Sequence, residues 1–472
     1  MPGADAPTGD AIASPQAATS KHVATVLPRS RPFFIAVPLM NALLMSAPPA
    51  CDDLCVSDLE RRRNIGEVPD AGLMTLDRFI GTTSLSAPFV NLLYPLPMPD
   101  PRFLHRLSDV PAAAWDALHD GRNPFLSHAF LAGLEEHGCL RPEWGWRPRH
   151  FTLWDGDTLV AAIPGYLKDN SHGEFVFDHA WAHAYAQHGL DYFPKWLGAV
   201  PYSPVTGPRL LAGTTEDRGA LLASLAGEVA RLGWSSAHIN FHPADEDPAF
   251  SSDWLLREDI QFQWHNPGSW QTFDDFLGAM DHKHRKNIRQ ERAKLARSGV
   301  TYRIVHGDEA TEADLRAMHG FYLQTFAEYG NSPALTLPFL QHLARTMPRS
   351  LVIFLALLDG EPVAGALCLR GADTLYGRYW GGATLPGLHF ETCYYQGIAY
   401  CLREGLARFE PGAQGEHKLA RGFLPHRVRS RHWIAEPAFA EALIAWCAQE
   451  RAEVAHYARV LASHSPFKAD PA

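Results

Sequence analysis

Several short motifs that mark large enzyme classes are missing from this 472-residue sequence. It has no GxSxG nucleophile elbow, no GxxxxGK[ST] phosphate-binding loop and no GxGxxG dinucleotide pattern, which argues against hydrolase, kinase and dehydrogenase functions. It also has no HExxH pair, and no CxxC pair among its seven cysteines. An odd number of widely scattered cysteines is typical of a reducing compartment.

Positive charge and long apolar runs are also scarce. Lys and Arg total 42 against 52 Asp and Glu, a net charge of −10, so the whole protein does not attract nucleic acid or an anionic membrane. The most apolar run, residues 32–50, is interrupted by Pro38 and Asn41 and is shorter than the roughly 20 residues of a membrane span. We therefore expect a cytoplasmic protein without stable membrane insertion, in which any polyanion meets a local basic patch.

The first hundred residues differ in composition from the rest. Residues 1–31 are rich in Ala, Pro, Ser and Thr without apolar periodicity, which is typical of disorder because there is little apolar surface to bury. Residues 1–100 are predicted to be a disordered extension. The alternative is a start codon assigned too far upstream, with Met74 or Met98 as the true first residue.

From residue 102 onward, one order of elements occurs twice. Helical patterns lead into two β-rich runs around Asp155-Gly156, and later helices lead into two more around Asp359-Gly360; a DG pair between such runs predicts a hairpin. The segments LWDGDTLVAAI and LLDGEPVAGAL align without a gap. We predict an α+β protein with two tandem units, 102–265 and 266–472, the second ending in a C-terminal helix.

This plan resembles the GNAT acyltransferase fold, and its doubled form resembles the FemAB-like proteins of peptidoglycan biosynthesis and recognition. The resemblance rests on the segments NPFLSHAFLAGLEEHG, PYSPVTGPRLL, HFETCYYQGIAYC and FEPGAQGEHKLARGFLP. It implies an N-acyltransferase with no tightly bound cofactor, which moves an acyl or aminoacyl group from acyl-CoA or aminoacyl-tRNA to an amine on a cell-wall precursor. The sequence departs from the GNAT pattern in lacking its Q/R-x-x-G-x-G/A loop, which puts ordinary acetyl-CoA binding in doubt.

Glycines mark the junction of a strand and a helix in the second unit. In YWGGATLPGLHFE, Gly381, Gly382 and Gly387 allow close approach of a ligand, and the helix is expected to begin near His389. Backbone N–H groups and the helix dipole favour anions at such a junction. We predict a cradle for the phosphates of the donor, with a plain turn as the alternative.

The helix that follows carries two polar candidates. Tyr394, Ile398 and Cys401 recur at helical spacing and predict a buried stripe. Tyr395 and Gln396 are expected off this stripe, where the phenol of Tyr395 would donate a proton or hydrogen bond to an oxyanion or leaving group and Gln396 would contact substrate.

The stretch after this helix, GEHKLARGF, is predicted to be extended. Alternation would then place Glu416 and Lys418 on one face, and His417 and Arg421 on the face of the apolar residues. His417 or Glu416 is the expected base, and Lys418 and Arg421 are expected to stabilise charge. A structural hairpin held by ion pairs is the alternative.

A basic helix stands out in this acidic chain. Residues 283–297 contain seven Lys and Arg, and Arg285, Arg289 and Arg292 share a face. Such a face suits tRNA, a lipid-linked pyrophosphate or a CoA phosphate. The alternative is a solvated helix packed on the acidic remainder.

The first unit offers a corresponding cleft. The segment HAWAHAYAQHG pairs histidines with aromatic residues, and PYSPVTGPR contributes polar groups beside Gly207; the expected substrate-binding residues are His179, Trp181, Tyr185, Tyr202, Thr206 and Arg209. His188 lies in the same stretch, and His179 and His183 have the spacing of a zinc pair, but the HExxH glutamate is missing, so no metal is expected. An alternative function from this cleft is a non-catalytic module that binds peptidoglycan fragments or a lipid-linked precursor. The oligomeric state stays open.

Overall fold

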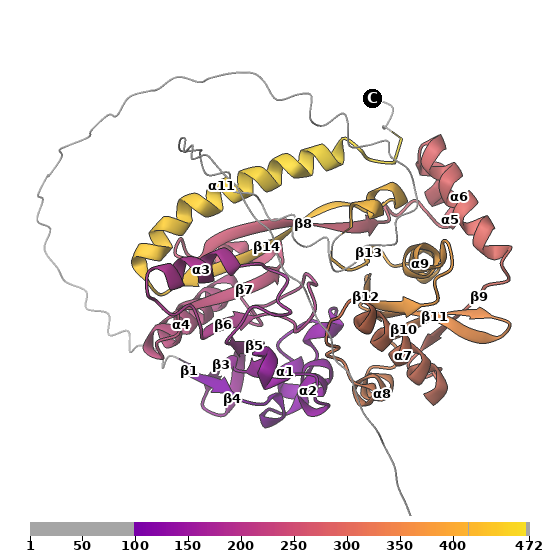
Figure 1. Ribbon diagram of the computed structural model, residues 1–472. Coiled ribbons are helices and arrows are strands. Elements are labelled where there is room, and N and C mark those ends of the chain that lie inside the picture. The colour runs from indigo at the N-terminus through magenta and orange to yellow at the C-terminus, as the bar shows by residue number, and fades with distance from the viewer. Residues whose placement is uncertain (1–98, 414, 469–472) are drawn as a thin grey trace, which may run out of the picture. The chain divides into compact units, whose positions relative to one another are not determined.

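The computed structural model describes residues 99–413 and 415–468 (Figure 1). Of the predicted N-terminal extension, residues 1–100, residues 1–98 lie outside the described residues, and Asp100 already belongs to a strand. The described chain is a mixed α+β structure with two sheets, one of three strands and one of eleven strands. No helix in these two ranges is long and apolar enough to cross a membrane.

The small sheet lies in the first repeat, predicted as 102–265, although its first strand begins at Asp100. Its strand order is β1 (Asp100–Leu104), β3 (His150–Asp155), β4 (Thr158–Ile163), all antiparallel. The predicted hairpin between β3 and β4 is confirmed, and its turn lies at Gly156-Asp157 because Asp155 still pairs with Thr158. Helices α1 (Ala112–Asp116) and α2 (His128–Glu136) precede it, and the Ser127 hydroxyl caps α2 by accepting from the N–H of Phe130.

The large sheet begins in the first repeat. It runs β2 (Arg147–Pro148), β5 (Gly165–Lys168), β6 (Lys195–Gly198), β7 (Ser236–His242), with β6 and β7 parallel. Helix α3 (His179–Gln187) precedes β6, and α4 (Thr215–Arg231) connects β6 to β7. A parallel neighbour reached through a helix is the expected crossover connection.

The second repeat (266–472) supplies the other end of the same sheet. The strand order is β13 (Arg408–Glu410), β12 (Thr374–Gly382), β11 (Glu361–Arg370), β10 (Leu351–Leu358), β9 (Thr301–His306). The predicted hairpin at Asp359-Gly360 is confirmed, with both residues at positive φ. Its helices are α5 (Phe273–Ala279), α6 (His282–Ala296), α7 (Glu312–Glu328), α8 (Leu337–Thr346), α9 (Leu388–Phe390) and α10 (Gln396–Glu404).

The two repeats are joined inside this sheet. Strand β14 (Leu424–Ile434) lies between β7 and β8 (Leu255–His265), antiparallel to both, and β8 also pairs with β13. Helix α11 (Pro437–Ala462) packs along β8 and β14 (Figure 1). The last strand of the second repeat thus completes the sheet of the first, and the division at 265/266 stays a prediction.

A shared core also links the repeats. The ring of Phe130 on α2 lies 5.6 Å from that of Phe339 on α8, within one cluster that combines buried residues of both repeats. Short 3-10 segments complete the described chain: Leu107–Asp109, Pro124–Leu126, Pro142–Trp144, Ala244–Ala249 and Glu416–Arg421. A π-helical turn, Glu391–Tyr395, separates α9 from α10.

Candidate functional site

The parallel strands β12 and β13 pair over three residues only. Pairing ends at Tyr376 and Glu410, while β12 continues to Gly382 against β11. The register of β12 against β11 shifts just beyond this point and leaves Arg378 as an extra residue, a β-bulge. No further pairing between the two strands occurs in the described residues. We call this place the second open end, because it lies in the second repeat and the first repeat has a similar one, described below.

The segment after β13 was predicted to be extended, and that prediction is wrong. Glu416–Arg421 forms a 3-10 helix between Gly415 and Gly422, whose φ values of 108° and 88° favour glycine. The N–H of Lys418 donates to Gly415 O and that of Gly422 to Leu419 O, which closes two tight turns. In a segment of six residues, the pattern of apolar residues cannot distinguish the two-residue period of a strand from the three-residue period of a 3-10 helix.

The helical turn changes which side chain is buried. Lys418 is 3 % exposed, whereas the strand prediction placed it on the face away from the apolar residues. Its Nζ donates to Gly412 O at 2.8 Å and to Ala413 O at 3.0 Å. Burial and, more weakly, the charge of Arg378 lower the pKa of Lys418 to about 7. A buried amine at the second open end therefore changes its charge near neutral pH.

His417 and Tyr394 meet beside Lys418. Their Nε2 and hydroxyl atoms lie 2.9 Å apart, and the His417 side chain stays open to solvent on its other side. Partial burial, then the charges of Lys418 and Arg421, lower the pKa of His417 to about 4. Burial, then His417, Lys418 and Arg421, lower the pKa of His389 to about 3. Both imidazoles are therefore neutral at neutral pH and available to accept a proton.

Arg421 is held at this cluster by three contacts. Its guanidinium carbon lies 3.4 Å from the ring centroid of Phe390, and it donates to His417 O at 2.9 Å and to Glu291 on α6 at 3.0 Å. Glu416 faces elsewhere, because its carboxylate accepts a hydrogen bond from Tyr457 on α11. The structure thus brings His417, Lys418 and Arg421 together and separates Glu416 from them.

The π-helical turn moves Tyr395 from its predicted place. Tyr394, Ile398 and Cys401 are buried as expected, but Tyr395 is also buried, and its hydroxyl donates to Glu291. The prediction that it lies off the buried stripe is wrong because one extra residue in the turn rotates the helix face. Gln396 donates to Glu391 at 2.8 Å.

The glycines of the expected phosphate cradle are explained in part by packing. A Cβ on Gly381 would lie 2.0 Å from Phe321 O, and one on Gly382 would lie 2.2 Å from the Cβ of Ala364. Gly387 begins α9 at a φ of 85°, and a Cβ there would lie 3.9 Å from Glu291 O of α6. Gly381 thus packs on α7 and Gly387 borders α6, and the cradle stays a prediction.

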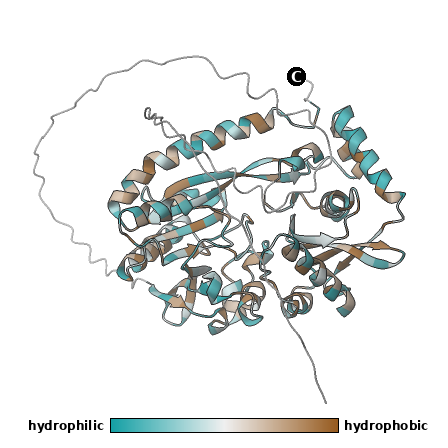
Figure 2. Cartoon of the chain, viewed as in Figure 1, coloured by the Kyte–Doolittle hydropathy of each residue, from teal (hydrophilic) through white to brown (hydrophobic). Residues whose placement is uncertain are grey.

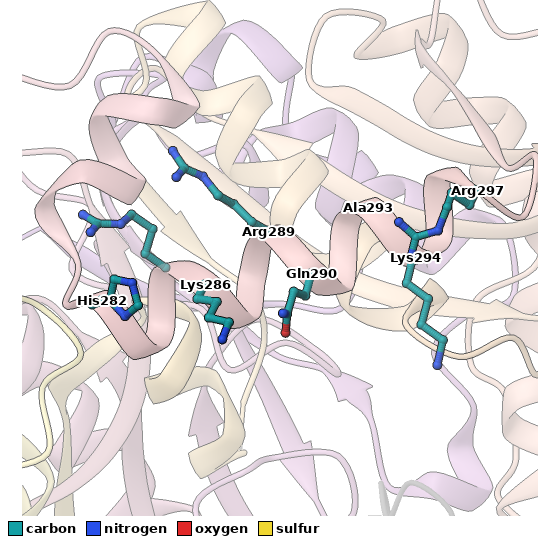
Figure 3. Close-up of a pocket in the computed structure, with 8 residues that line it drawn as sticks. His282, Lys286, Arg289, Gln290, Ala293, Lys294 and Arg297 are labelled. Carbon is teal, nitrogen blue, oxygen red and sulfur yellow. The ribbon is translucent and has the colours of Figure 1, made fainter.

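Helix α6 is confirmed, and its two sides differ. Arg292 turns inward and binds Glu391 with Nη2 at 3.0 Å, so it leaves the outward face predicted for it. The outward side forms an open, shallow groove lined by His282, Arg285, Lys286, Arg289, Gln290, Ala293, Lys294 and Arg297, which we call the basic face. Figure 2 shows α6 as strongly hydrophilic, and in Figure 3 Lys286, Gln290 and Lys294 extend from the same side of the helix.

The first repeat has a matching open end, where β6 stops at Gly198 while β7 continues to His242. Arg209 fills it. The guanidinium is fully buried and donates to the carbonyls of Asn240, Gly207, Pro208 and Val205 at 2.6–3.1 Å. Tyr202 O accepts from Arg378 at 3.1 Å and from Tyr379 at 3.3 Å. These contacts give Arg209 a structural role, and the part predicted for Tyr202, Thr206 and Arg209 in substrate binding stays a prediction.

The aromatic and histidine residues of α3 lie on opposite sides of the helix. Trp181 and Tyr185 are 2 % exposed and pack on α11 through Trp446 and Phe439, at ring distances of 5.7 and 4.1 Å. His179 and His183 are exposed. The predicted cleft residues therefore do not share one surface, and the described residues contain no group of three or more metal-ligating side chains.

Glu410, in the segment FEPG, was not predicted to be a functional residue. Glu410 is the last residue of β13 and is 8 % exposed, and its carboxylate accepts from Gln263 Nε2 at 3.1 Å. The sequence feature that could have identified it is an acidic residue at the carboxyl end of a short buried strand.

The chain matches a known protein family. A family model described as peptidoglycan biosynthesis/recognition, FemAB-like, matches residues 106–469. No curated protein matches the chain.

Similar solved structures include FemX, at 11 % identity over 70 % of this chain and 98 % of that chain, with a TM-score of 0.44. L-PGS from Bacillus licheniformis is similar at 10 % identity over 66 % and 94 %, with a TM-score of 0.41. A tandem GNAT protein from the clavulanic acid biosynthesis pathway is similar at 11 % identity over 72 % and 99 %, with a TM-score of 0.36.

Proposed function

Because the chain belongs to the FemAB-like family, we propose that it is an N-acyltransferase. It transfers an acyl or aminoacyl group from a thioester or ester, acyl-CoA or aminoacyl-tRNA, to an amine on a cell-wall precursor. The observation that supports this most is Lys418, a buried amine at the second open end with no carboxylate within 4.0 Å among the described residues. A buried cation without an anionic partner is costly to folding, and such groups concentrate at functional sites.

The proposed chemistry uses this amine against developing negative charge. When the acceptor amine attacks the donor carbonyl, the carbonyl oxygen becomes an oxyanion, and a cation held in a site of low dielectric stabilises it. The Lys418 ammonium takes this role, and the Arg421 guanidinium, fixed on Phe390, takes the negative charge of the donor's phosphates. Tyr394 in place of the predicted Tyr395 supplies the hydroxyl nearest His417, since Tyr395 is bound to Glu291.

The basic face of α6 supports aminoacyl-tRNA as the donor. It presents five Lys and Arg along one helix of an acidic protein, and the backbone of the same helix at Glu291 borders Gly387 at the start of α9. A row of exposed cations binds a phosphate backbone through release of its counterions. Binding by this face predicts a strong dependence on salt.

The test uses the full chain and its Lys418→Met variant. Ligands retained on the purified protein are identified by mass spectrometry, and thermal shifts are measured with acyl-CoAs and with aminoacyl-tRNA. Transfer is then followed with the stabilising donor and amine-bearing cell-wall precursors. Stabilisation by one donor class, with turnover that the variant lacks, is the expected result. If neither donor class stabilises the protein and none is consumed, the proposal is wrong.

A further inference from the structure

Glu410 occupies the one position where the two parallel strands of the second repeat stop pairing. Its partner in the register is Tyr376, and the bulged residue Arg378 follows two positions later on β12. Bulges next to the end of a ladder commonly redirect side chains at active sites. The Glu410 side chain lies on the opposite side of β13 from Phe409, which packs on Gly397 of α10.

The Glu410 carboxylate is buried without an ion-pair partner. No Lys, Arg or His nitrogen lies within 4.0 Å of it in the described part of the chain, and its hydrogen bond comes from the neutral amide of Gln263. Three guanidinium groups surround it at longer range, but each is bonded elsewhere: Arg408 to Asp373, Arg378 to Tyr202 O and Arg209 to backbone carbonyls. A buried carboxylate in such surroundings is not explained by stability.

These surroundings place its titration near neutrality. Burial raises the pKa of Glu410 to about 7, while Arg408, Arg378, the backbone N–H of Thr206 and Arg209 act in the opposite direction. A base works best when its conjugate acid has a pKa near the working pH. His417, the base expected from the sequence, has a pKa lowered to about 4 and is a much weaker base.

Resting on the acyl transfer proposed above, we propose that the Glu410 carboxylate takes the proton of the attacking amine at the second open end, directly or through one water molecule. The amine nitrogen forms a bond to the acyl carbon, its proton passes to Glu410, and the bond from the acyl carbon to the thiolate or alkoxide leaving group breaks. The leaving group then recovers the proton, so the amide and the free thiol or alcohol are the products. No further reactant is needed.

Glu246 provides a matched control. It is also a buried carboxylate without an ion pair among the described residues, and burial raises its pKa to about 7 as well. However, it accepts the backbone N–H groups of Arg209 and Leu210 at 2.8 and 3.0 Å, in the first repeat. Glu246→Gln keeps an oxygen for these bonds and should leave the second open end intact.

The first measurement is the pH profile of transfer for wild type, Glu410→Gln and Glu246→Gln. Wild-type kcat/KM should fall on the acid side of pH about 7 as Glu410 is protonated. Glu410→Gln should lose about 100-fold in kcat/KM, the low end of general-base effects, and should lose this acid limb. Glu246→Gln should keep both. An acid limb near pH 4 in wild type, or a normal rate in Glu410→Gln, contradicts the proposal.

The second measurement needs no turnover and separates this proposal from the proposed function. Since the folded protein holds the Glu410 proton more tightly than the unfolded chain does, wild-type stability should fall as pH rises from 4.5 to about 7. Glu410→Gln should therefore melt at a higher temperature than wild type at pH 8 and match it at pH 4. Equal melting temperatures at pH 8, or a less stable variant, mean that Glu410 is structural and the proposal is wrong, whether or not transfer is detected.

Discussion

The two open ends of the large sheet differ in the buried cation that lies beside each one. In the first repeat Arg209 is always charged in practice and has four carbonyl partners, so its cost of burial is offset by hydrogen bonds. In the second repeat Lys418 has two carbonyl partners and a pKa near 7. Each repeat therefore buries a cation near its parallel strand pair, a structural one in the first repeat and a titratable one in the second.

The largest expected effect is on the first open end. Arg209→Met should lower the free energy of unfolding by about 3–5 kcal/mol, because several buried carbonyls lose their donor at roughly 1–3 kcal/mol each. Denaturant unfolding measures it as a lower midpoint. A loss below about 1 kcal/mol would mean that the first open end is not held together by this guanidinium, and the contrast between the repeats would disappear.

At the second open end the same kind of change should have the opposite sign. Lys418→Met removes a buried cation and should leave stability unchanged or raise it by about 1–2 kcal/mol at neutral pH. Transfer should fall by about 100-fold, as for the loss of one oxyanion donor. A variant as unstable as Arg209→Met would show that both cations are structural.

The pH dependence of this stability difference follows from the direction of the shift. The folded state holds the Lys418 proton less tightly than the unfolded chain, so unfolding takes up a proton between pH about 7 and 10.5 and wild-type stability rises with pH in that window. The difference in stability between Lys418→Met and wild type, in favour of the variant, should be greatest below pH 7 and vanish above pH 10.5. Melting curves from pH 6 to 10.5 measure it.

A smaller effect is expected from Tyr394→Phe. It removes the hydroxyl that bonds His417 Nε2 and should cost about 0.5–1.5 kcal/mol of stability, the usual contribution of one hydrogen bond. Because neither Lys418 nor Glu410 bonds this hydroxyl, the acid limb of the transfer profile should stay near pH 7. If the pH at which kcat/KM falls on the acid side changes in Tyr394→Phe, His417 and not Glu410 is the base.

The smallest effect on stability is expected on the basic face. Lys286→Glu combined with Lys294→Glu should change the free energy of unfolding by no more than about 0.5 kcal/mol, since both side chains are exposed. Affinity for tRNA and its salt dependence should both drop. The control is Arg231→Glu on α4, an exposed charge reversal in the first repeat, compared with Lys286→Glu alone so that both variants change the charge by two. Equal loss of tRNA binding in the control would exclude a specific role for α6.

Local features of this fold were predictable from sequence. The two hairpins and the helices α2 and α6 depend on residues close together in the chain, so local patterns predicted them, although the first turn lies one residue beyond its DG pair. The position of β14 depends on pairing with β7 and β8 far earlier in the sequence, and no local pattern contains that information.

The site was harder to predict for two physical reasons. A π-helical turn shifts the helix face by one residue, which moved Tyr395 into the core, and a six-residue 3-10 segment has no distinguishable period, which hid the burial of Lys418. The role of Glu410 depends on the absence of a nearby cation in three dimensions. Sequence shows the carboxylate and not its surroundings.

The position of β14 also sets the order in which the protein can fold during synthesis. His238 on β7 and His432 on β14 form a buried contact across 194 residues of chain. Until the ribosome has released β14, β7 and β8 each have an unpaired edge, and such edges invite pairing with other chains. We expect the nascent first repeat to need protection. A chain truncated before residue 424 should aggregate, because it also lacks the α11 residues that cover Trp181 and Tyr185.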